Sequence, residues 1–269
     1  MGARLLKDHV DARDLVASTS WGVLRVTPPW GGLADIDGLV QQLTHWCQQP
    51  LVFQEAPSDP PEVEDAARVQ CTVCDLRLAP VGTEVSLPID LLRHLAPPLP
   101  LQGAAIRWPQ LAFQVVVASL DEAAIQAAQI EEGGMMLLPH AFQMPWVVRM
   151  QSTDGWCALV GHMRLNAGLI DLVQQSHDVA HADQGELLDV DAWRVELARP
   201  LVLSLPVVMG WVPGIQSVPV DYSCDLDRPT EFGLSAVLHH LQRGVSVSGM
   251  VIPVMSGAAL SVRTGHTVW

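Results

Sequence analysis

One pattern occurs twice in the chain, as Ile130-Glu-Glu-Gly-Gly-Met-Met-Leu-Leu-Pro139 and as Leu241-Gln-Arg-Gly-Val-Ser-Val-Ser-Gly-Met-Val-Ile-Pro253. Each copy has an apolar residue, two polar or charged residues, a glycine turn and an apolar strand. A strand, a turn and a second strand follow each copy, over residues 145–156 and 258–269. The sequence therefore predicts a small β-module that occurs twice. Neither copy contains a nucleophile, a general base or a cluster of metal ligands, which favours assembly over catalysis.

The composition restricts the class of protein and of partner. The chain has 269 residues, of which 49% are hydrophobic, and this predicts a globular protein with a large core. The formal net charge of -14 argues against a nucleic-acid partner, because binding to phosphates needs clustered lysine and arginine. The same charge disfavours adsorption to anionic lipid. We therefore expect the partners to be neutral or basic protein surfaces.

Two features indicate a cytoplasmic protein. The five cysteines are odd in number and irregular in spacing, which is typical of reduced thiols in a core. The N-terminal segment has early charges and no apolar run, so we expect no signal peptide. Residues 200–220 contain no charge and are nearly long enough to span a bilayer, but prolines recur through them. We expect two buried strands there, joined by a turn at Pro213 and Gly214.

Periodicity predicts an α+β fold, with an α/β N-terminal domain over residues 1–120 and two β-rich modules over 121–205 and 210–269. Helices are predicted over 35–48, with Asp35 as the cap, over 89–95, over 121–129 and over 234–241. An acidic, proline-rich loop is expected over 54–65. The predicted strands are 22–26, a bulged strand at 69–78, 111–120, 135–138, 146–150, 157–165, 187–197 and an alternating strand at 218–226.

The second module resembles the SPOA (surface presentation of antigens) domain that flagellar motor-switch proteins share with their type III secretion counterparts. The match rests on Val218-Pro-Val-Asp-Tyr-Ser-Cys-Asp-Leu226 and on Leu234-Ser-Ala-Val-Leu-His-His-Leu-Gln-Arg-Gly244. Val251-Ile-Pro-Val254 and Ala259-Leu-Ser-Val-Arg-Thr-Gly265 continue it. Residues 130–138 resemble the same glycine turn and strand in a more diverged first copy. An N-terminal region followed by two such domains resembles the sorting-platform, or C-ring, subunit of type III secretion systems.

This resemblance implies a non-enzymatic structural subunit at the cytoplasmic face of the inner membrane, held there by other subunits, with no cofactor and no metal. It would bind the ATPase-stator subunit and the adaptor subunit, and help to recruit chaperone–effector complexes. In that family the SPOA domains pair as intertwined β-dimers, either within one chain or with a separately made copy of the last domain. Met209 stands where an internal start could produce such a copy. The candidate partner-binding or turn positions are Gly133, Leu137, Trp146, Val220, Tyr222, Leu238, Leu241, Gly244 and Val251.

The chain departs from the family pattern at its end. Family members usually continue past the position of Trp269 with a further strand pair. We therefore expect the second module to be incomplete. An incomplete sheet has an open edge, and such an edge needs a partner strand.

Other functions stay open at this point. The pair Cys71 and Cys74 lies in a predicted strand, without the second pair that structural zinc requires. Residues three apart in a regular strand point to opposite faces, so a shared ligand would also require a bulge. A metal-dependent hydrolase would use His177 and His181, which are four apart, although no glutamate lies between them to act as a base. The nearer alternative is a motor-switch relative or another SPOA-type protein-binding module.

Overall fold

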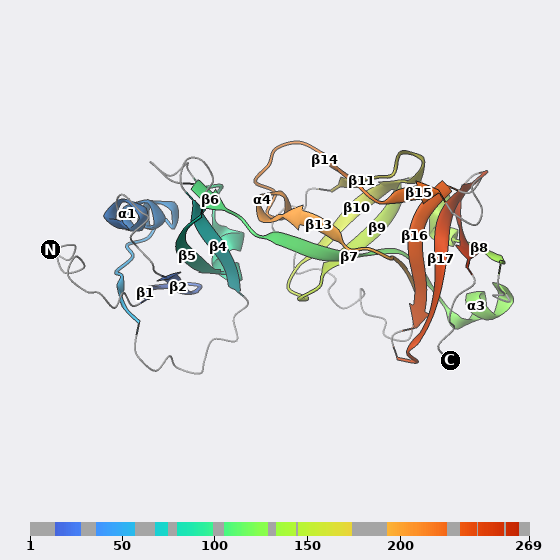
Figure 1. Ribbon diagram of the computed structural model, residues 1–269, viewed down its shortest axis with the longest axis horizontal. Helices are drawn as coiled ribbons and strands as arrows, with labels where there is room; N and C mark the ends of the chain where they lie inside the picture. The colour runs from blue at the N-terminus through green and yellow to red at the C-terminus, as the bar shows by residue number, and fades with distance from the viewer. Residues whose placement is uncertain are drawn as a thin grey trace. The chain divides into compact units, whose positions relative to one another are not determined.

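The structure is a computed structural model, and it describes residues 14–27, 36–56, 68–74, 80–98, 105–128, 133–143, 145–173, 193–224, 232–240, 242–255 and 257–263. The described chain is mostly antiparallel β-sheet, which confirms the β-rich part of the predicted α+β fold. The described strands of the N-terminal region pair antiparallel, so this region is not the predicted α/β domain. Two compact units are present (Figure 1). Unit 1 comprises Met1–Gln110 and Ser204–Val212, and unit 2 comprises Leu111–Leu203 and Pro213–Trp269. This division differs from the predicted boundaries at 120 and 205: residues 111–120 and most of the two predicted modules fall within unit 2, while residues 204–212 fall within unit 1.

Unit 1 is an antiparallel sheet with three described helices. Its strands have the order β3-β1-β2-β5-β4-β6. Inward-facing Leu24, Val26, Val85 and Leu87 form the core of the sheet, and Leu91 of a helix is buried as well. The strands are β1 (Leu15–Thr19), β2 (Gly22–Thr27), β3 (Gln54–Glu55), β4 (Arg68–Cys74), β5 (Pro80–Pro88) and β6 (Ala105–Arg107), and the helices are α1 (Ile36–Trp46), α2 (Ile89–His94) and α4 (Leu205–Val208).

Local signals predicted four elements of unit 1, namely α1, α2, β2 and β4, but not β1, β3, β5, β6 or α4. Helices α1 and α2 lie where the apolar periodicity placed them. The predicted bulge is present in β4, where the register with β5 shifts between Thr72 and Cys74. The predicted cap Asp35 lies outside the described residues, as does most of the predicted loop at 54–65.

Unit 2 contains one large antiparallel sheet. Its strands have the order β14-β11-β10-β9-β7-β12-β16-β17-β18-β8, while β13 pairs with β7 and β15 pairs with β16. Helix α3 (Glu122–Ala128) begins where predicted, with the Asp121 carboxylate accepting a hydrogen bond from the Ala124 N–H. The strands are β7 (Gln110–Leu120), β8 (Met135–Leu137), β9 (Trp146–Ser152), β10 (Ala158–Arg164), β11 (Leu169–Leu172), β12 (Trp193–Leu197), β13 (Leu201–Ser204), β14 (Gln216–Pro219), β15 (Tyr222–Cys224), β16 (Phe232–His240), β17 (Val245–Val254) and β18 (Gly257–Val262), and short 3₁₀ helices span η1 (Pro139–Phe142) and η2 (Leu165–Ala167).

The sheet of unit 2 has two similar halves that exchange a strand. In the first half β9, β10 and β11 form a meander, and in the second half β16, β17 and β18 do the same (Figure 1). Strands β7 and β12 pair with each other and join the two meanders. At the outer ends, β8 of the first half pairs with β18 of the second, while β14 of the second half pairs with β11 of the first. Each half therefore completes the sheet of the other.

The predicted helix over 234–241 is wrong, because residues 232–240 form strand β16. Leu234 and Leu238 fit both a helical spacing and a strand alternation. In the strand they lie on the same buried face as Ala236 and His240. Hydrogen bonding to β12, β15 and β17 decides in favour of the strand, since a central strand position gains ladder bonds on both sides.

Two further expectations are corrected. The single strand predicted over 218–226 is interrupted, since β14 ends at Pro219 and β15 begins at Tyr222. The two glycine turns of the sequence pattern are also not equivalent. Gly244 lies in the hairpin between β16 and β17, whereas Gly133 precedes β8 and donates its N–H to the Val262 carbonyl. The counterpart of Gly244 in the first half is Gly155, in the hairpin between β9 and β10.

A bulge in β7 explains the burial of Trp146. The register between β7 and β12 shifts so that Val195 pairs with Ala118 and Glu196 with Val116, and Val117 is left over. The Trp146 indole Nε1 donates a buried hydrogen bond to the Val117 carbonyl at 3.1 Å. A core tryptophan thus satisfies the backbone group that the bulge removes from the ladder.

The uncharged stretch 200–220 is not one continuous element. It forms β13, the single-turn helix α4 and β14. Among the residues that the structure describes, no helix is long and apolar enough to cross a membrane.

Candidate functional site

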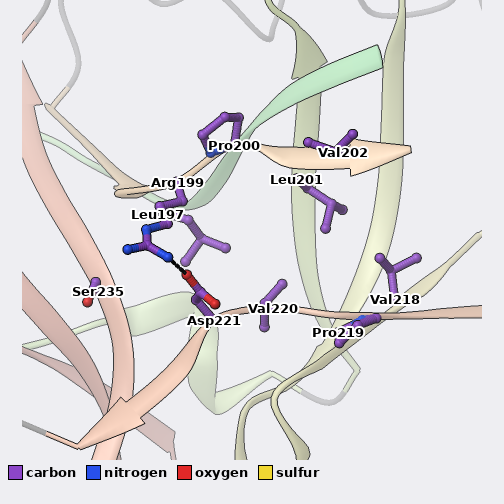
Figure 2. Close-up of a pocket in the computed structure, with 10 residues that line it drawn as sticks. All are labelled: Leu197, Arg199, Pro200, Leu201, Val202, Val218, Pro219, Val220, Asp221 and Ser235. Carbon is purple, nitrogen blue, oxygen red and sulfur yellow. Dashed lines mark hydrogen bonds and ion pairs between the residues drawn. The ribbon is translucent and has the colours of Figure 1, made fainter. Parts of the chain in front are cut away.

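The candidate site is an open pocket of about 350 Å³ in unit 2. One wall is the segment from Pro200 to Val202, and the facing wall is the segment from Val218 to Asp221 (Figure 2). Leu197 of β12 and Ser235 of β16 close one end (Figure 2). Most of the lining is apolar, so the pocket suits an aliphatic or aromatic side chain of a partner.

Hydrogen bonds to backbone carbonyl groups hold the two walls. The Gln114 side chain donates to the Leu197 carbonyl at 2.9 Å, and the Ala198 N–H donates to the Ser235 carbonyl at 2.9 Å. On the facing wall, the Val220 N–H donates to the Gly168 carbonyl at 2.9 Å. Val220 is therefore fixed to the turn between β10 and β11.

Glycine is required at position 168 for two reasons. Its φ of +59° is in the left-handed region that side chains disfavour. A Cβ atom there would also lie 2.9 Å from the Cβ of Tyr222. The close approach allows the segment that follows β14 to pass over this turn, and so it shapes the second wall of the pocket.

The charged part of the pocket is one exposed ion pair. Arg199 Nη1 lies 2.6 Å from Asp221 Oδ2, with the two side chains 79% and 60% exposed (Figure 2). An ion pair this exposed contributes little to stability, because water screens it. Both groups are available to the charged groups of a partner, and they would orient a ligand whose apolar part enters the pocket.

A polar network holds the exchanged strand β14 against the first half of the sheet. Arg164 Nε lies 2.7 Å from Asp171 Oδ2, and the Ser217 hydroxyl donates to Asp171 Oδ1 at 2.6 Å. Arg164 Nη2 also reaches the Ser217 hydroxyl, at 3.2 Å. The hydrogen bond from Ser217 and then the Arg164 guanidinium lower the pKa of Asp171 below its usual value. Since Ser217 belongs to β14, the ionised carboxylate supports the wall that carries Val218.

Replacement of this carboxylate should have a pH-dependent effect. The folded-state pKa of Asp171 is lowered, so its ionised form stabilises the fold above the unfolded pKa of about 4, and this contribution is lost as pH falls through the folded value. We expect Asp171→Asn to lower the thermal midpoint at pH 7, and the difference from wild type to shrink steadily below about pH 4. Thermal melts of both proteins from pH 7 to pH 3 measure this. A difference that stays constant with pH would contradict the assignment.

The positions predicted from sequence fall into three groups. Trp146, Leu238 and Val251 are core residues, with at most 4% of their surface exposed, so they do not offer a binding surface. Val220 lines the pocket, and Tyr222 is partly exposed just beyond it. The remaining described positions are Leu137, on the exposed strand β8, and the turn residues Gly133 and Gly244, whereas Leu241 lies outside the described residues.

The cysteine pair of β4 is buried. The bulge leaves both Cys71 and Cys74 inside unit 1, with free thiols. Burial raises the pKa of Cys71 to about 12, so this thiol is almost entirely protonated at neutral pH. A buried, protonated thiol is a poor nucleophile, which agrees with its interpretation as a core residue. Within the described ranges no three histidine, cysteine or acidic residues group as metal ligands, and His177 and His181 lie outside those ranges.

Sequence reasoning missed one wall of the pocket. Two buried strands joined by a turn at Pro213 and Gly214 were expected over 200–220, but β13 pairs with β7, β14 pairs with β11, and β14 is half-exposed. The two segments therefore face each other across a pocket and do not pair as a hairpin. The available signal was the lack of charge over 200–220, which predicted burial but not a cavity.

Comparisons with protein-family models, with curated proteins and with solved structures find no match for this chain.

Proposed function

We propose that this chain is a non-enzymatic structural subunit of a type III protein secretion sorting platform. In this role it binds the ATPase-stator and adaptor subunits and helps to recruit chaperone–effector complexes at the cytoplasmic face of the inner membrane. The pocket between β13 and β14 is the docking site for one of these subunits.

The observation that carries the proposal is the reciprocal exchange of β8 and β14. The SPOA resemblance implies two related β-modules that intertwine. An exchange of outer strands between two meanders is what such an arrangement requires, and it is present within one chain. The support comes from the order of the strands in the sheet. The sequence repeat gives no support, because its two glycine turns lie at positions that are not equivalent in the two halves.

The pocket supports the proposal through its chemistry. Apolar side chains such as Leu201 and Val202 form its lining, and one ion pair lies at its rim. A partly exposed apolar surface with a polar rim is typical of a protein-binding site. Val202 is 55% exposed although it is an aliphatic residue in a strand, so it has the character of a contact residue.

A charge placed in the pocket tests this proposal. We expect Val202→Asp to weaken binding of the stator or adaptor subunit about tenfold or more, because an unpaired carboxylate would be desolvated in an apolar contact. Val147→Asp is the matched control: Val147 is also a strand valine, 47% exposed, but it lies on β9 outside the pocket. Co-purification and titration of the full chain with subunits from the same operon provide the measurement.

The outcomes separate the proposal from its alternative. Loss of binding by Val202→Asp but not by Val147→Asp supports both the function and the site. If both variants bind equally well, the subunit docks on a surface other than the pocket. If neither subunit binds the wild-type chain, the platform function is wrong. Binding to flagellar motor-switch subunits in the same assay would instead favour the motor-switch relative.

A further inference from the structure

Strand β8 forms an outer edge of the large sheet in unit 2. It pairs with β18 on one side, with Met136 opposite Leu260 and Leu137 opposite Ala259. Among the described residues it has no strand on its other side. Its sequence is Met-Met-Leu, with no charge and no proline. A charged side chain and a proline are two of the devices that prevent pairing at a strand edge, and β8 contains neither.

The hydrogen bonds to β18 show which backbone groups of β8 point outward. Leu138 donates its N–H to the Ala258 carbonyl at 3.0 Å, and Gly134 accepts from the Val262 N–H at 2.9 Å. In an antiparallel ladder, alternate residues direct both backbone groups to the same neighbour. Met136 therefore also faces β18, and the N–H and C=O groups of Met135 and Leu137 face away from it.

The opposite edge of the same sheet is built differently. In β14 the Val220 N–H, just past the strand, points toward the first half of the sheet, where it binds the Gly168 carbonyl. By the same alternation, residue 219 points outward, and this residue is Pro219, which has no N–H to donate. The Ser217 hydroxyl is occupied by Asp171. Pro219 thus removes one outward donor from the β14 edge, whereas the β8 edge, as far as the structure describes it, keeps the outward N–H groups of Met135 and Leu137.

The backbone groups of the β8 edge are complementary to those of a second β8 edge. If two β8 strands lie antiparallel with a two-fold axis at Met136, Met135 of one copy faces Leu137 of the other, and the converse pair is identical. In each pair the N–H of Met135 then faces the C=O of Leu137 in the other copy, and the C=O of Met135 faces the N–H of Leu137. The side chains also match, since Met135 and Leu137 are 63% and 59% exposed, share one face of the strand and are both apolar.

We propose that β8 is a self-association edge, through which two copies of this chain join their large sheets into one continuous antiparallel sheet. This inference does not depend on the proposed function. The strand is short, so the contact area is small and the dimer is weak and concentration-dependent. The formal charge of -14 on each copy opposes association, so added salt should strengthen the dimer rather than weaken it.

Backbone and charge effects can be separated with variants of the full chain. Leu137→Pro removes the outward N–H and leaves the inward bonds to β18 in place. It deletes one hydrogen bond from each copy, so we expect dimerisation to weaken at least about tenfold. Leu137→Val keeps the N–H and an apolar side chain and should dimerise as wild type does. Light scattering across a concentration series, at low and at high salt, gives the dissociation constants, and circular dichroism checks that each variant is folded.

Cross-linking tests the register independently. Met135→Cys and Leu137→Cys copies, mixed under mild oxidation, should form a disulfide-linked dimer, because directly opposed strand residues lie within disulfide range. Each variant alone, and the wild type, should give much less of it. A wild type that is monomeric at every concentration and salt, a folded Leu137→Pro variant that dimerises normally, or equal cross-linking by single variants and the mixture would each overturn the proposal.

Discussion

Trp146→Ala is expected to destabilise unit 2 by about 3–5 kcal/mol, which is typical of a large aromatic residue removed from a core. Trp146 is buried in β9, and its indole binds the backbone carbonyl of Val117 at the β7 bulge. Truncation leaves a cavity and also a buried carbonyl without a donor. Trp146→Phe, which retains most of the ring, should cost about 1–3 kcal/mol, chiefly for the lost hydrogen bond.

Urea unfolding of each variant measures these values, with Trp156→Ala as the matched control. Trp156 lies in the adjacent hairpin, where its indole donates to the exposed side chain of Asp154. Trp156 is only partly buried, so its loss should cost less than that of Trp146, about 1 kcal/mol as is typical of single substitutions. The comparison also separates two interpretations of Trp146. A partner-binding residue would lose binding at unchanged stability, whereas a core residue loses stability first.

Gly233→Ala is the second substitution with a large expected effect. Gly233 lies in β16 between β15 and β17. A Cβ atom there would overlap the backbone carbonyl of Val251 and would approach Ile252 Cγ2 and Met250 Cγ to 2.9 Å. A carbonyl in a central ladder cannot move aside without breaking hydrogen bonds. We expect a loss of about 3 kcal/mol, at the upper end for overpacked cores, and misfolding with Gly233→Val.

The control for this prediction is Gly155→Ala. Gly155 has a positive φ of +78°, but a Cβ atom there would meet nothing within 4 Å. Its substitution carries only the backbone cost of a left-handed conformation, roughly 1–2 kcal/mol. Chemical denaturation of both variants gives the comparison. If Gly233→Ala lowers the free energy of unfolding no more than Gly155→Ala does, the sheet adjusts at position 233 and the prediction is wrong.

Trp146 and strand β16 show which structural features local sequence patterns predict and which they do not. The pattern around Trp146 predicted a strand, and β9 is a strand. The role of Trp146 as a core residue depends on a bulge in β7, about thirty residues earlier in sequence, which no local pattern encodes. For β16, the leucines at 234 and 238 fit helical and strand periods equally well. The neighbouring strands that choose between them come from residues 193–197, 222–224 and 245–254.

The candidate site shows the same division. Val220 and Tyr222 were predicted from an alternating strand, and they lie at or beside the pocket. The facing residues, Arg199 to Val202, were not predicted, because the pocket exists only where two chain segments are brought together by β7, β11 and β16. The shape of such a pocket depends on contacts between residues far apart in sequence more than on the types of the residues that line it.

By itself, the sequence determined the β-rich character of the chain, helices α1, α2 and α3 and the bulge in β4. These features follow from periodicity, capping and turn residues, which act over a few positions along the chain. Only the tertiary structure decided that the two meanders exchange β8 and β14, that Trp146 belongs to the core and that β8 has no further strand beside it among the described residues. The physical reason is that a strand of three or four residues has no stable conformation alone. It forms where a distant strand offers it unpaired N–H and C=O groups, and the position of that strand is a property of the whole fold.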